Sequence, residues 1–332
     1  LGGNIFLSII AVLISIIACK TGLTFALLTR YSFGSTGSKA ASIFVPVVNL
    51  GWYTIQAATY GHFVAQVFHM GQVGEGICMA VSAIVMGIFA MCGIGAITIL
   101  GYIAIPAIVF LSIATAIRSL GVIGGMEALF AYVPSSDMPL FTGITAVIGT
   151  WVLSTATCIA DIMRYAKDTK AAVSATLTGL LGGNILMIVC GAIAAIAMQN
   201  SDLTVILLGF GLVIPSLILM TTNIFTTNAA NLYSTSLNLS NAFKMERKKM
   251  LAILLVLSAL ATLTKPYEIG FLFTFLNILG TVVPPLSGII LSDYFLVHKG
   301  HYAAYDKASF CKWNPVPWIT WAISIALVYM IP

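Results

Sequence analysis

Two amides flank an indole in the second apolar segment of this chain. Asn49, Trp52 and Gln56 are spaced i, i+3 and i+7, which places all three side chains on one face of a helix. An indole stacks on planar rings and an amide hydrogen-bonds their edges, so the spacing fits a site for a flat heterocycle. The same amides also fit hydrogen bonds to a neighbouring helix in lipid, and the spacing favours neither interpretation.

A second tryptophan lies in a stretch that is rich in hydroxyl side chains. Trp151 follows Thr150 and precedes Ser154, and four hydroxyls occur within eight residues. Such a composition predicts an interrupted helix whose backbone lines a cavity. Asp161 and Arg164 follow at a spacing of i and i+3, and we expect them to form an ion pair at the helix end rather than a catalytic pair.

A third cluster combines an amide with two hydroxyls. Asn223, Thr226 and Thr227 fall within about one helical turn, and uncharged oxygens of this kind suit a small monovalent cation. Hydrogen bonding of the hydroxyls to the helix backbone is the alternative. Further on, Pro284 and Pro285 remove two backbone donors, which predicts a kink or an end of the helix. Transporters place broken helices beside cavities and hinges.

These side chains belong to a chain that is too apolar to be water-soluble. Of its 332 residues, 60% are hydrophobic and only 8% are charged, and the mean hydropathy is +1.05. Soluble domains carry about 25% charged residues. The net charge of +5 is too small to indicate a nucleic-acid partner. The six cysteines are scattered singly, which predicts neither a metal site nor a disulfide framework.

Apolar runs long enough to cross a bilayer predict an all-α polytopic membrane protein. The Gly/Ser-rich stretch 30–39 between the first two runs is predicted to be a turn, with a gating role as the alternative. The ten predicted spans are 1–19, 40–68, 76–93, 95–117, 141–163, 171–198, 203–231, 249–264, 268–296 and 316–332.

The positions of the basic residues give an independent test of this layout. When the connections are numbered alternately, Arg118 and Lys265 fall on one side and the other 13 of the 15 Lys and Arg residues fall on the opposite side. This asymmetry follows the positive-inside rule and predicts that the basic side is cytoplasmic. The basic side holds Lys20, Arg30, Lys39, Arg164, Lys167, Lys170, Lys244, Arg247, Lys248, Lys249, Lys299, Lys307 and Lys312.

Charged residues are absent from the middle of every predicted span. Ionisable groups at the membrane midplane mark proton relays and the paths of charged substrates. Their absence predicts a neutral, polar solute. The chain also lacks a G-x-S-x-G, an H-E-x-x-H and a Walker motif, so enzyme chemistry has no visible site.

At these residues the chain resembles the bacterial cytosine permeases of the nucleobase–cation symporter family. The matching stretches occur in the family's order and extend over nearly the whole chain. They are Lys20-Thr21-Gly22-Leu23, Arg30-Tyr31-Ser32-Phe33-Gly34, Gly51-Trp52, Ala160-Asp161 with Arg164, Asn223-Ile224-Phe225-Thr226-Thr227-Asn228, Pro284-Pro285 and Ser292-Asp293-Tyr294.

The resemblance implies a twelve-helix, leucine-transporter-like fold built from two inverted five-helix repeats. The ten spans look like the family's second to eleventh helices, so we expect the first and last helices to be absent from this chain. The residues 1–332 then form a single transmembrane transporter domain. Its repeat halves are expected at about 1–120 and 138–298, with one helix following at 316–332.

The resemblance also implies roles for individual residues. Trp52 and Trp151 look like the two aromatic faces of a base-binding sandwich, and Gln56 stands where hydantoin-carrying relatives have a substrate-binding glutamine. The implied substrate-binding residues are Asn49, Trp52, Gln56, Thr150, Trp151, Ser154 and Asn228. The implied sodium-binding residues are Asn223, Thr226 and Thr227.

The function implied is the sodium-coupled import of a neutral nucleobase, with cytosine as the first candidate, by alternating access. We expect a monomer in the bacterial inner membrane that uses Na⁺ as coupling ion and no cofactor, nucleic acid or catalytic residue. The alternatives within this class are a purine, an allantoin- or hydantoin-like ring, a thiamine-precursor pyrimidine, and proton coupling. A channel or a membrane-embedded enzyme is the alternative from another class.

Overall fold

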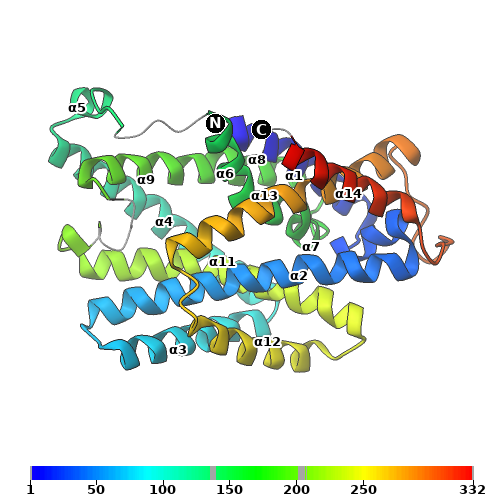
Figure 1. Ribbon diagram of the computed structural model, residues 1–332, viewed down its shortest axis with the longest axis horizontal. Helices are drawn as coiled ribbons and strands as arrows, with labels where there is room; N and C mark the ends of the chain where they lie inside the picture. The colour runs from blue at the N-terminus through cyan, green and yellow to red at the C-terminus, as the bar shows by residue number, and fades with distance from the viewer. Residues whose placement is uncertain (1, 135–139, 201–205, 207, 331–332) are drawn as a thin grey trace.

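Long apolar helices lie side by side along the long axis of the molecule (Figure 1). The computed structural model describes residues 2–134, 140–200, 206 and 208–330, and every regular element in these ranges is a helix. Among the described residues, five helices are long and apolar enough to cross a membrane by length and composition. They are Gly2–Thr21, Gln72–Met91, Gly95–Ile123, Thr169–Met198 and Gly270–Val297.

The helices follow the predicted spans, and three short π-helical segments (η1 to η3) interrupt or extend them. The elements are α1 (Gly2–Thr21), α2 (Phe25–Val67), α3 (Gln72–Met91), α4 (Ile94–Ile123), α5 (Met126–Phe130), α6 (Leu140–Leu153), η1 (Ser154–Cys158), α7 (Ile159–Met163), α8 (Thr169–Leu177), η2 (Thr178–Asn184), α9 (Ile185–Met198), α11 (Val213–Phe243), α12 (Arg247–Thr262), α13 (Ile269–Ser292), η3 (Asp293–Val297) and α14 (Pro315–Met330).

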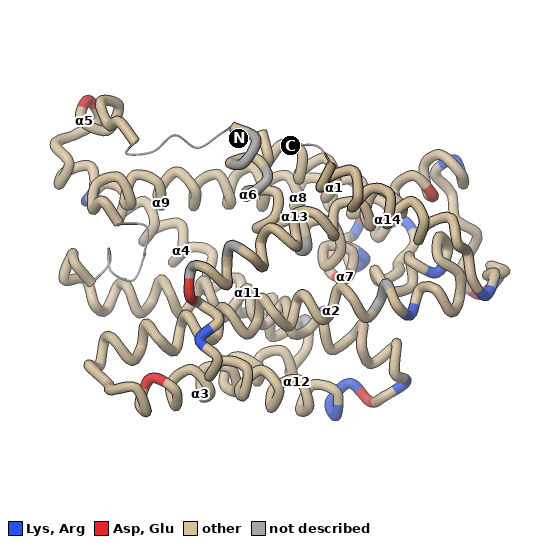
Figure 2. Tube along the Cα trace, viewed as in Figure 1, with Lys and Arg blue, Asp and Glu red and all other residues tan. Residues whose placement is uncertain are grey.

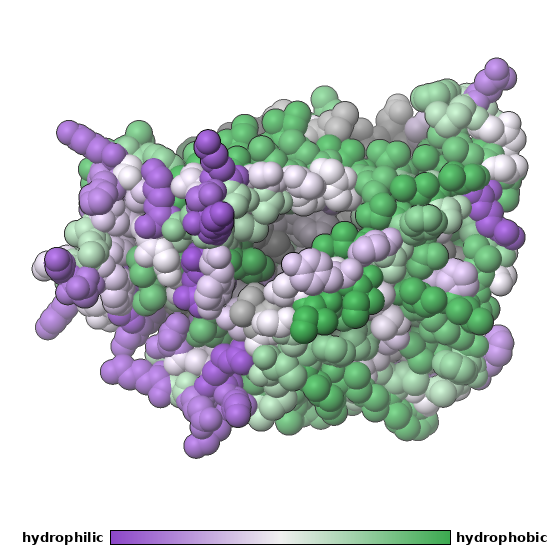
Figure 3. All heavy atoms as spheres, turned by 180° about the vertical axis from the view of Figure 1, so that it is seen from behind, coloured by the Kyte–Doolittle hydropathy of each residue, from purple (hydrophilic) through white to green (hydrophobic). Residues whose placement is uncertain are grey.

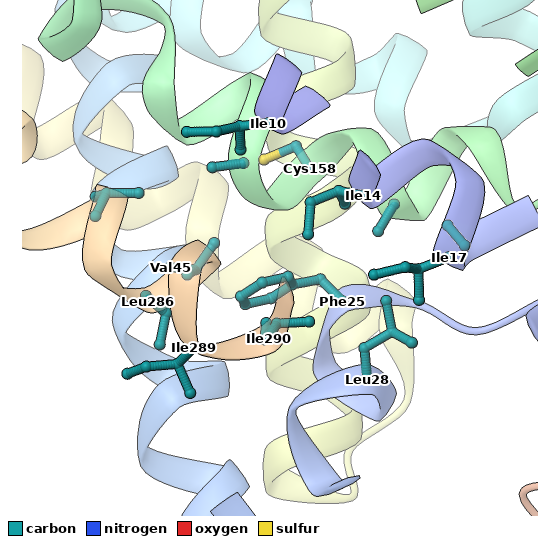
Figure 4. Close-up of a cluster of buried hydrophobic side chains, with 14 of the residues drawn as sticks. Ile10, Ile14, Ile17, Phe25, Leu28, Val45, Cys158, Leu286, Ile289 and Ile290 are labelled. Atoms are coloured by element: carbon teal, nitrogen blue, oxygen red, sulfur yellow. The ribbon is translucent and has the colours of Figure 1, made fainter. Parts of the chain in front are cut away.

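Two large hydrophobic cores divide most of these helices between them. The first core joins α1, the first half of α2, the segment from α6 to α7, and α13 (Figure 4). The second core joins the second half of α2 with α3, α11 and α12. The helix α2 therefore runs from one core into the other, whereas α7 belongs to the first core and α11 to the second.

The predicted turn between two helices is a kink at Gly34, and the stretch 30–39 is helical on both sides of it. Gly34 has φ at +80° and ψ at 173°, so the element α2 consists of two helices that meet at this residue. The backbone N–H groups of Ser35 and Thr36 donate to the carbonyls of Cys311 (2.8 Å) and Lys312 (2.9 Å). A Cβ at Gly34 would lie 2.6 Å from the Cys311 carbonyl oxygen. A distant segment thus accepts the hydrogen bonds of the first N–H groups after the kink, which have no acceptor in the preceding helix.

Two helix boundaries differ from the prediction. The helix α11 continues beyond residue 231 to Phe243. The prolines Pro284 and Pro285 do not end a helix, since α13 extends on both sides of them. Membrane helices tolerate proline where neighbouring helices satisfy the freed backbone groups.

Most of the charged residues lie toward the two ends of the bundle (Figure 2). Most Lys and Arg residues lie at the end where α1 meets α2 and where α11 meets α12 (Figure 2). Viewed from behind, that end is hydrophilic and most of the remaining surface is hydrophobic (Figure 3). The predicted asymmetry of the cations is therefore present in three dimensions.

Candidate functional site

A cavity of about 1000 Å³ lies between α2, α4, α6, η2 and α11. Four of the predicted site residues line it, namely Gln56 from α2, Trp151 from α6, and Asn223 and Thr227 from α11. No Asp, Glu, Lys or Arg is among the described residues of its wall. The structure thus brings residues that are up to about half the chain apart to the wall of one neutral, mostly apolar cavity, and small-molecule sites are usually mostly apolar.

A smaller cavity of about 310 Å³ shares Trp151 and Thr227 with the first. Its wall continues to Thr155 and Cys158 in η1, and to Asn231 one turn further along α11. The two cavities together follow α6, η1 and α11 toward the Lys/Arg-rich end of the bundle.

Both cavities are bordered by π-helical segments. The segment η1 (Ser154–Cys158) interrupts the helix directly after the sequence around Trp151, so the predicted interruption is confirmed. The segment η2 (Thr178–Asn184) holds three glycines and lines the larger cavity. Single π-helical turns within α-helices occur frequently at functional sites. The side chain of Ser154 lies outside the described residues.

Gln56 lines the larger cavity and has a side-chain oxygen that is available to a ligand. Its side-chain Oε1 is buried and has no hydrogen-bond partner among the described residues. A buried amide oxygen without a partner costs free energy, about 1–3 kcal/mol, unless a ligand or water satisfies it. Because Gln56 and Trp151 line the same cavity, that cavity offers both an indole and an amide oxygen without a partner.

Three other predicted residues have contacts outside the cavities. Trp52 packs edge-on against Phe275 of α13, with ring centroids 5.4 Å apart. Asn49 is buried and donates to the Cys158 sulfur at 2.9 Å. Thr150 adjoins Trp151 but lines neither cavity. For Asn49, the structure agrees with the interpretation of an interhelical amide.

Asn228 lies in the second core. It is fully buried, and its side-chain amide donates to the Tyr53 carbonyl at 3.1 Å and to the Met86 sulfur at 3.2 Å. Asn228 lines neither cavity, whereas Asn231 of the same helix lines the smaller one. Sequence reasoning missed it, although its spacing of i+4 from Thr227 and i+8 from Asn223 places it on their helix face.

A further amide missed from the sequence is Asn184 at the end of η2. It lines the larger cavity, and its side chain donates to the Asn4 side chain of α1 at 3.0 Å. No pattern in the sequence around residue 184 singles it out, because its neighbours are apolar.

The hydroxyls proposed for a cation are held in place by their own helix. The Thr226 hydroxyl donates to the carbonyls of Thr222 (2.8 Å) and Asn223 (2.9 Å), and the Thr227 hydroxyl donates to the Asn223 carbonyl at 3.0 Å. Each hydroxyl oxygen keeps acceptor capacity for a cation. Asn223 and Thr227 line the larger cavity, whereas Thr226 does not. No group of three or more His, Cys, Asp or Glu residues suited to a metal occurs in the described ranges.

The predicted ion pair between Asp161 and Arg164 is wrong. Asp161 is fully buried, and its carboxylate accepts hydrogen bonds from the Phe25 backbone N–H at 2.9 Å and from the side chains of Ser234 and Asn238. The Arg164 guanidinium donates to the backbone carbonyl of Asp161 at 3.4 Å instead. The carboxylate points into the bundle, where donors from two other helices replace the arginine.

The sequence matches a family model over nearly its full length. The model, described as permease for cytosine/purines, uracil, thiamine, allantoin, matches residues 1–331. The cytosine permease of Escherichia coli (strain K12) is 29% identical over 330 residues, which cover 99% of this chain and 77% of that protein. The hydantoin permease of Microbacterium maritypicum is 24% identical over 351 residues, which cover 95% of this chain and 70% of that protein.

Solved structures share the arrangement of the helices. Mhp1, a nucleobase-cation-symport-1 family transporter, in a closed conformation with bromovinylhydantoin bound, superposes with a TM-score of 0.86 at 20% identity, covering 99% of this chain and 79% of that chain. MhsT in complex with L-phenylalanine gives a TM-score of 0.70 at 16% identity, covering 98% and 88%. At these identities the likeness shows the fold, and the predicted leucine-transporter-like arrangement is confirmed.

Proposed function

Because the chain belongs to the family of permeases for cytosine/purines, uracil, thiamine and allantoin, we propose that it imports a neutral nucleobase, with cytosine as the first candidate. The family consists of transporters, so the chain is a multi-pass membrane protein and not an enzyme. Sodium as coupling ion, alternating access, a monomeric state and the bacterial inner membrane are parts of the same proposal.

The observation that carries the substrate class is the unpartnered Gln56 Oε1, in a residue that lines the same uncharged cavity as Trp151. The indole offers a stacking face worth about 1–3 kcal/mol per base. The amides of Gln56, Asn223 and Asn184 offer both donors and acceptors, as the mixed edge of a nucleobase requires. A charged substrate would lack a counter-ion in the described part of this wall.

A second candidate substrate is a hydantoin- or allantoin-like ring. The observation that favours it is that Gln56, and not Asn49, faces the cavity, since Asn49 is engaged with the Cys158 sulfur. The similarity to the hydantoin permease of Microbacterium maritypicum agrees with this alternative. Purines and thiamine-precursor pyrimidines complete the set of rings to be tested.

Sodium coupling rests on Asn223, Thr226 and Thr227. Their oxygens are uncharged and lie within one turn. Asn223 and Thr227 also line the cavity that Gln56 lines. A cation bound there would lie on α11, at the wall of the substrate cavity. Proton coupling is the alternative, and it predicts a response to the pH gradient instead of the sodium gradient.

Uptake by the intact permease in proteoliposomes tests this proposal. We expect labelled cytosine to accumulate under an inward sodium gradient and not under an equal potassium gradient, with unlabelled purines, hydantoin and allantoin competing more weakly. Thr227→Ala should reduce sodium-driven uptake at least tenfold. Thr222→Ala is the control, because the Thr222 hydroxyl donates to Ile218 within the same helix and lies away from the cavity. Sodium-independent uptake by the unmodified protein would overturn the ion assignment, and stronger competition by hydantoin would replace cytosine.

A further inference from the structure

Asp161 is a buried carboxylate that the binding site does not use. It lies on α7, and its two oxygens accept from the first turn of α2, through Phe25, and from two side chains of α11. Asn238 donates at 2.9 Å and Ser234 at 2.5 Å. All three partners are donors, so the carboxylate acts only as an acceptor.

The bonds from Ser234 and Asn238 join α7 of the first core to α11 of the second, two cores that share the helix α2. The residues around Asp161, including Cys158 and Ala160, belong to the first core, and α11 contributes its apolar side chains to the second. Polar side chains that cross between two separately packed bodies are the contacts that must change when one body moves against the other.

The position of Asp161 along the transport path is equally specific. The smaller cavity is lined by Cys158, Ile159 and Ile162, which flank Asp161 in sequence, and by Asn231, one turn before Ser234. The chain then continues from both α7 and α11 into the Lys/Arg-rich end of the bundle (Figure 2). The hydrogen bonds of Asp161 therefore lie between the cavities and the face that the positive-inside rule places in the cytoplasm.

A buried carboxylate contributes little to stability compared with an apolar side chain of similar volume. Desolvation of the charge opposes its hydrogen bonds, and apolar residues of similar volume often replace buried charges without loss of stability. Breakable polar contacts suit a position that has to separate and rejoin in each transport cycle.

We propose that Asp161 is a positioning residue that latches α7 to α11 and closes the cytoplasmic end of the substrate cavity, and that this latch opens when substrate leaves inward. The proposal rests on transport by alternating access, but not on which ring or which ion is carried.

Thiol labelling of Cys158 from the cytoplasmic side tests the latch. The other cysteines (Cys19, Cys78, Cys92, Cys190 and Cys311) are replaced by alanine, and a membrane-impermeant methanethiosulfonate reagent is added to inside-out vesicles. Ser234→Ala and Ser236→Ala form a matched pair, because both serines are buried on α11. Ser234 donates to Asp161, whereas Ser236 donates to the Tyr233 carbonyl of its own helix.

Because Ser234 and Asp161 lie beside the Cys158 thiol, each rate is divided by the rate with a small membrane-permeant methanethiosulfonate, so that changes in thiol reactivity cancel. We expect Ser234→Ala to raise this normalised labelling rate of Cys158 at least threefold and Ser236→Ala to leave it within a factor of 1.5. Asp161→Asn should raise it further, because the asparagine amide presents donors to groups that are themselves donors. Equal labelling of the Ser234→Ala and Ser236→Ala variants would overturn the latch. Since the labelling is measured without substrate or a sodium gradient, a wrong substrate or coupling ion would leave this result unchanged.

Discussion

Tyr267 donates a hydrogen bond of 2.7 Å to Glu75 and so fastens the connection between α12 and α13 to the start of α3. The same carboxylate accepts from Lys265 at 3.3 Å and pairs with His62 of α2 at 2.8 Å. The His62 and Tyr267 rings stack with centroids 4.5 Å apart. This cluster holds the beginning of α13, whose Phe275 covers the edge of Trp52.

Removing the Tyr267 hydroxyl should weaken this cluster. Burial and the Glu75 carboxylate raise the pKa of Tyr267, so its hydroxyl remains a donor at neutral pH. Tyr267→Phe keeps the ring on His62 and loses the hydrogen bond, which should lower the free energy of unfolding by about 1–3 kcal/mol. The measurement is thermal unfolding in detergent. Tyr329→Phe is the control, since Tyr329 is 72% exposed, and equal unfolding temperatures for the two variants would contradict the role of Tyr267.

Gly61 allows α2 and α3 to approach each other closely. A Cβ at this position would lie 2.3 Å from the Cα of Met79, and a backbone atom cannot move aside without displacing the helix. Gly61→Ala should therefore destabilise the protein by about 1–3 kcal/mol or more.

The control for Gly61 is Gly101→Ala on α4, where an added Cβ would meet nothing within 4 Å. That substitution should be neutral or stabilise the helix by up to about 1 kcal/mol. Unfolding temperatures of the two variants in the same detergent give the comparison. A Gly61→Ala protein as stable as the Gly101→Ala protein would mean that α2 and α3 are not in close contact.

The helices were predictable because the length of an apolar run is visible in the local sequence. The features at Gly34 and Asp161 depend on residues that are distant in the sequence. At the kink at Gly34, the carbonyls of Cys311 and Lys312 accept the hydrogen bonds of Ser35 and Thr36, and no local pattern reveals these partners. The burial of Asp161 depends in the same way on donors from α2 and α11. The division into inverted-repeat halves stays a prediction.

The candidate site was predictable in part for a similar reason. Asn49, Trp52 and Gln56 do share a helix face, but they extend over about 10 Å of helix axis. Over that distance the neighbouring element changes from η1 to α13 to the cavity, so each side chain has a different partner. Periodicity identifies the face of a helix, and only the packing of other helices decides what each residue on it contacts.

Trp151 should be the main stacking platform of the cavity. Trp151→Ala should raise the KM for the transported base by roughly 5- to 150-fold, the equivalent of about 1–3 kcal/mol, while Trp151→Phe keeps a ring face and should cost less. Concentration-dependent uptake gives these values. Trp313→Ala is the control, because Trp313 stacks on Trp318 and lines neither cavity. An unchanged KM in Trp151→Ala would remove this residue from the site.

Asn228 and Asn231 should separate stability from substrate binding. Asn228 bonds the Tyr53 carbonyl and the Met86 sulfur inside the second core, so Asn228→Ala should lower the free energy of unfolding by about 1–3 kcal/mol and leave the KM nearly unchanged. Asn231 lines the smaller cavity beside Trp151, so Asn231→Ala should raise the KM severalfold and leave the unfolding temperature close to that of the unmodified protein. Uptake kinetics and thermal unfolding on the same preparations measure both effects. A raised KM in Asn228→Ala would show that Asn228 belongs to the site. An unchanged KM in Asn231→Ala would show that the smaller cavity is not on the substrate path.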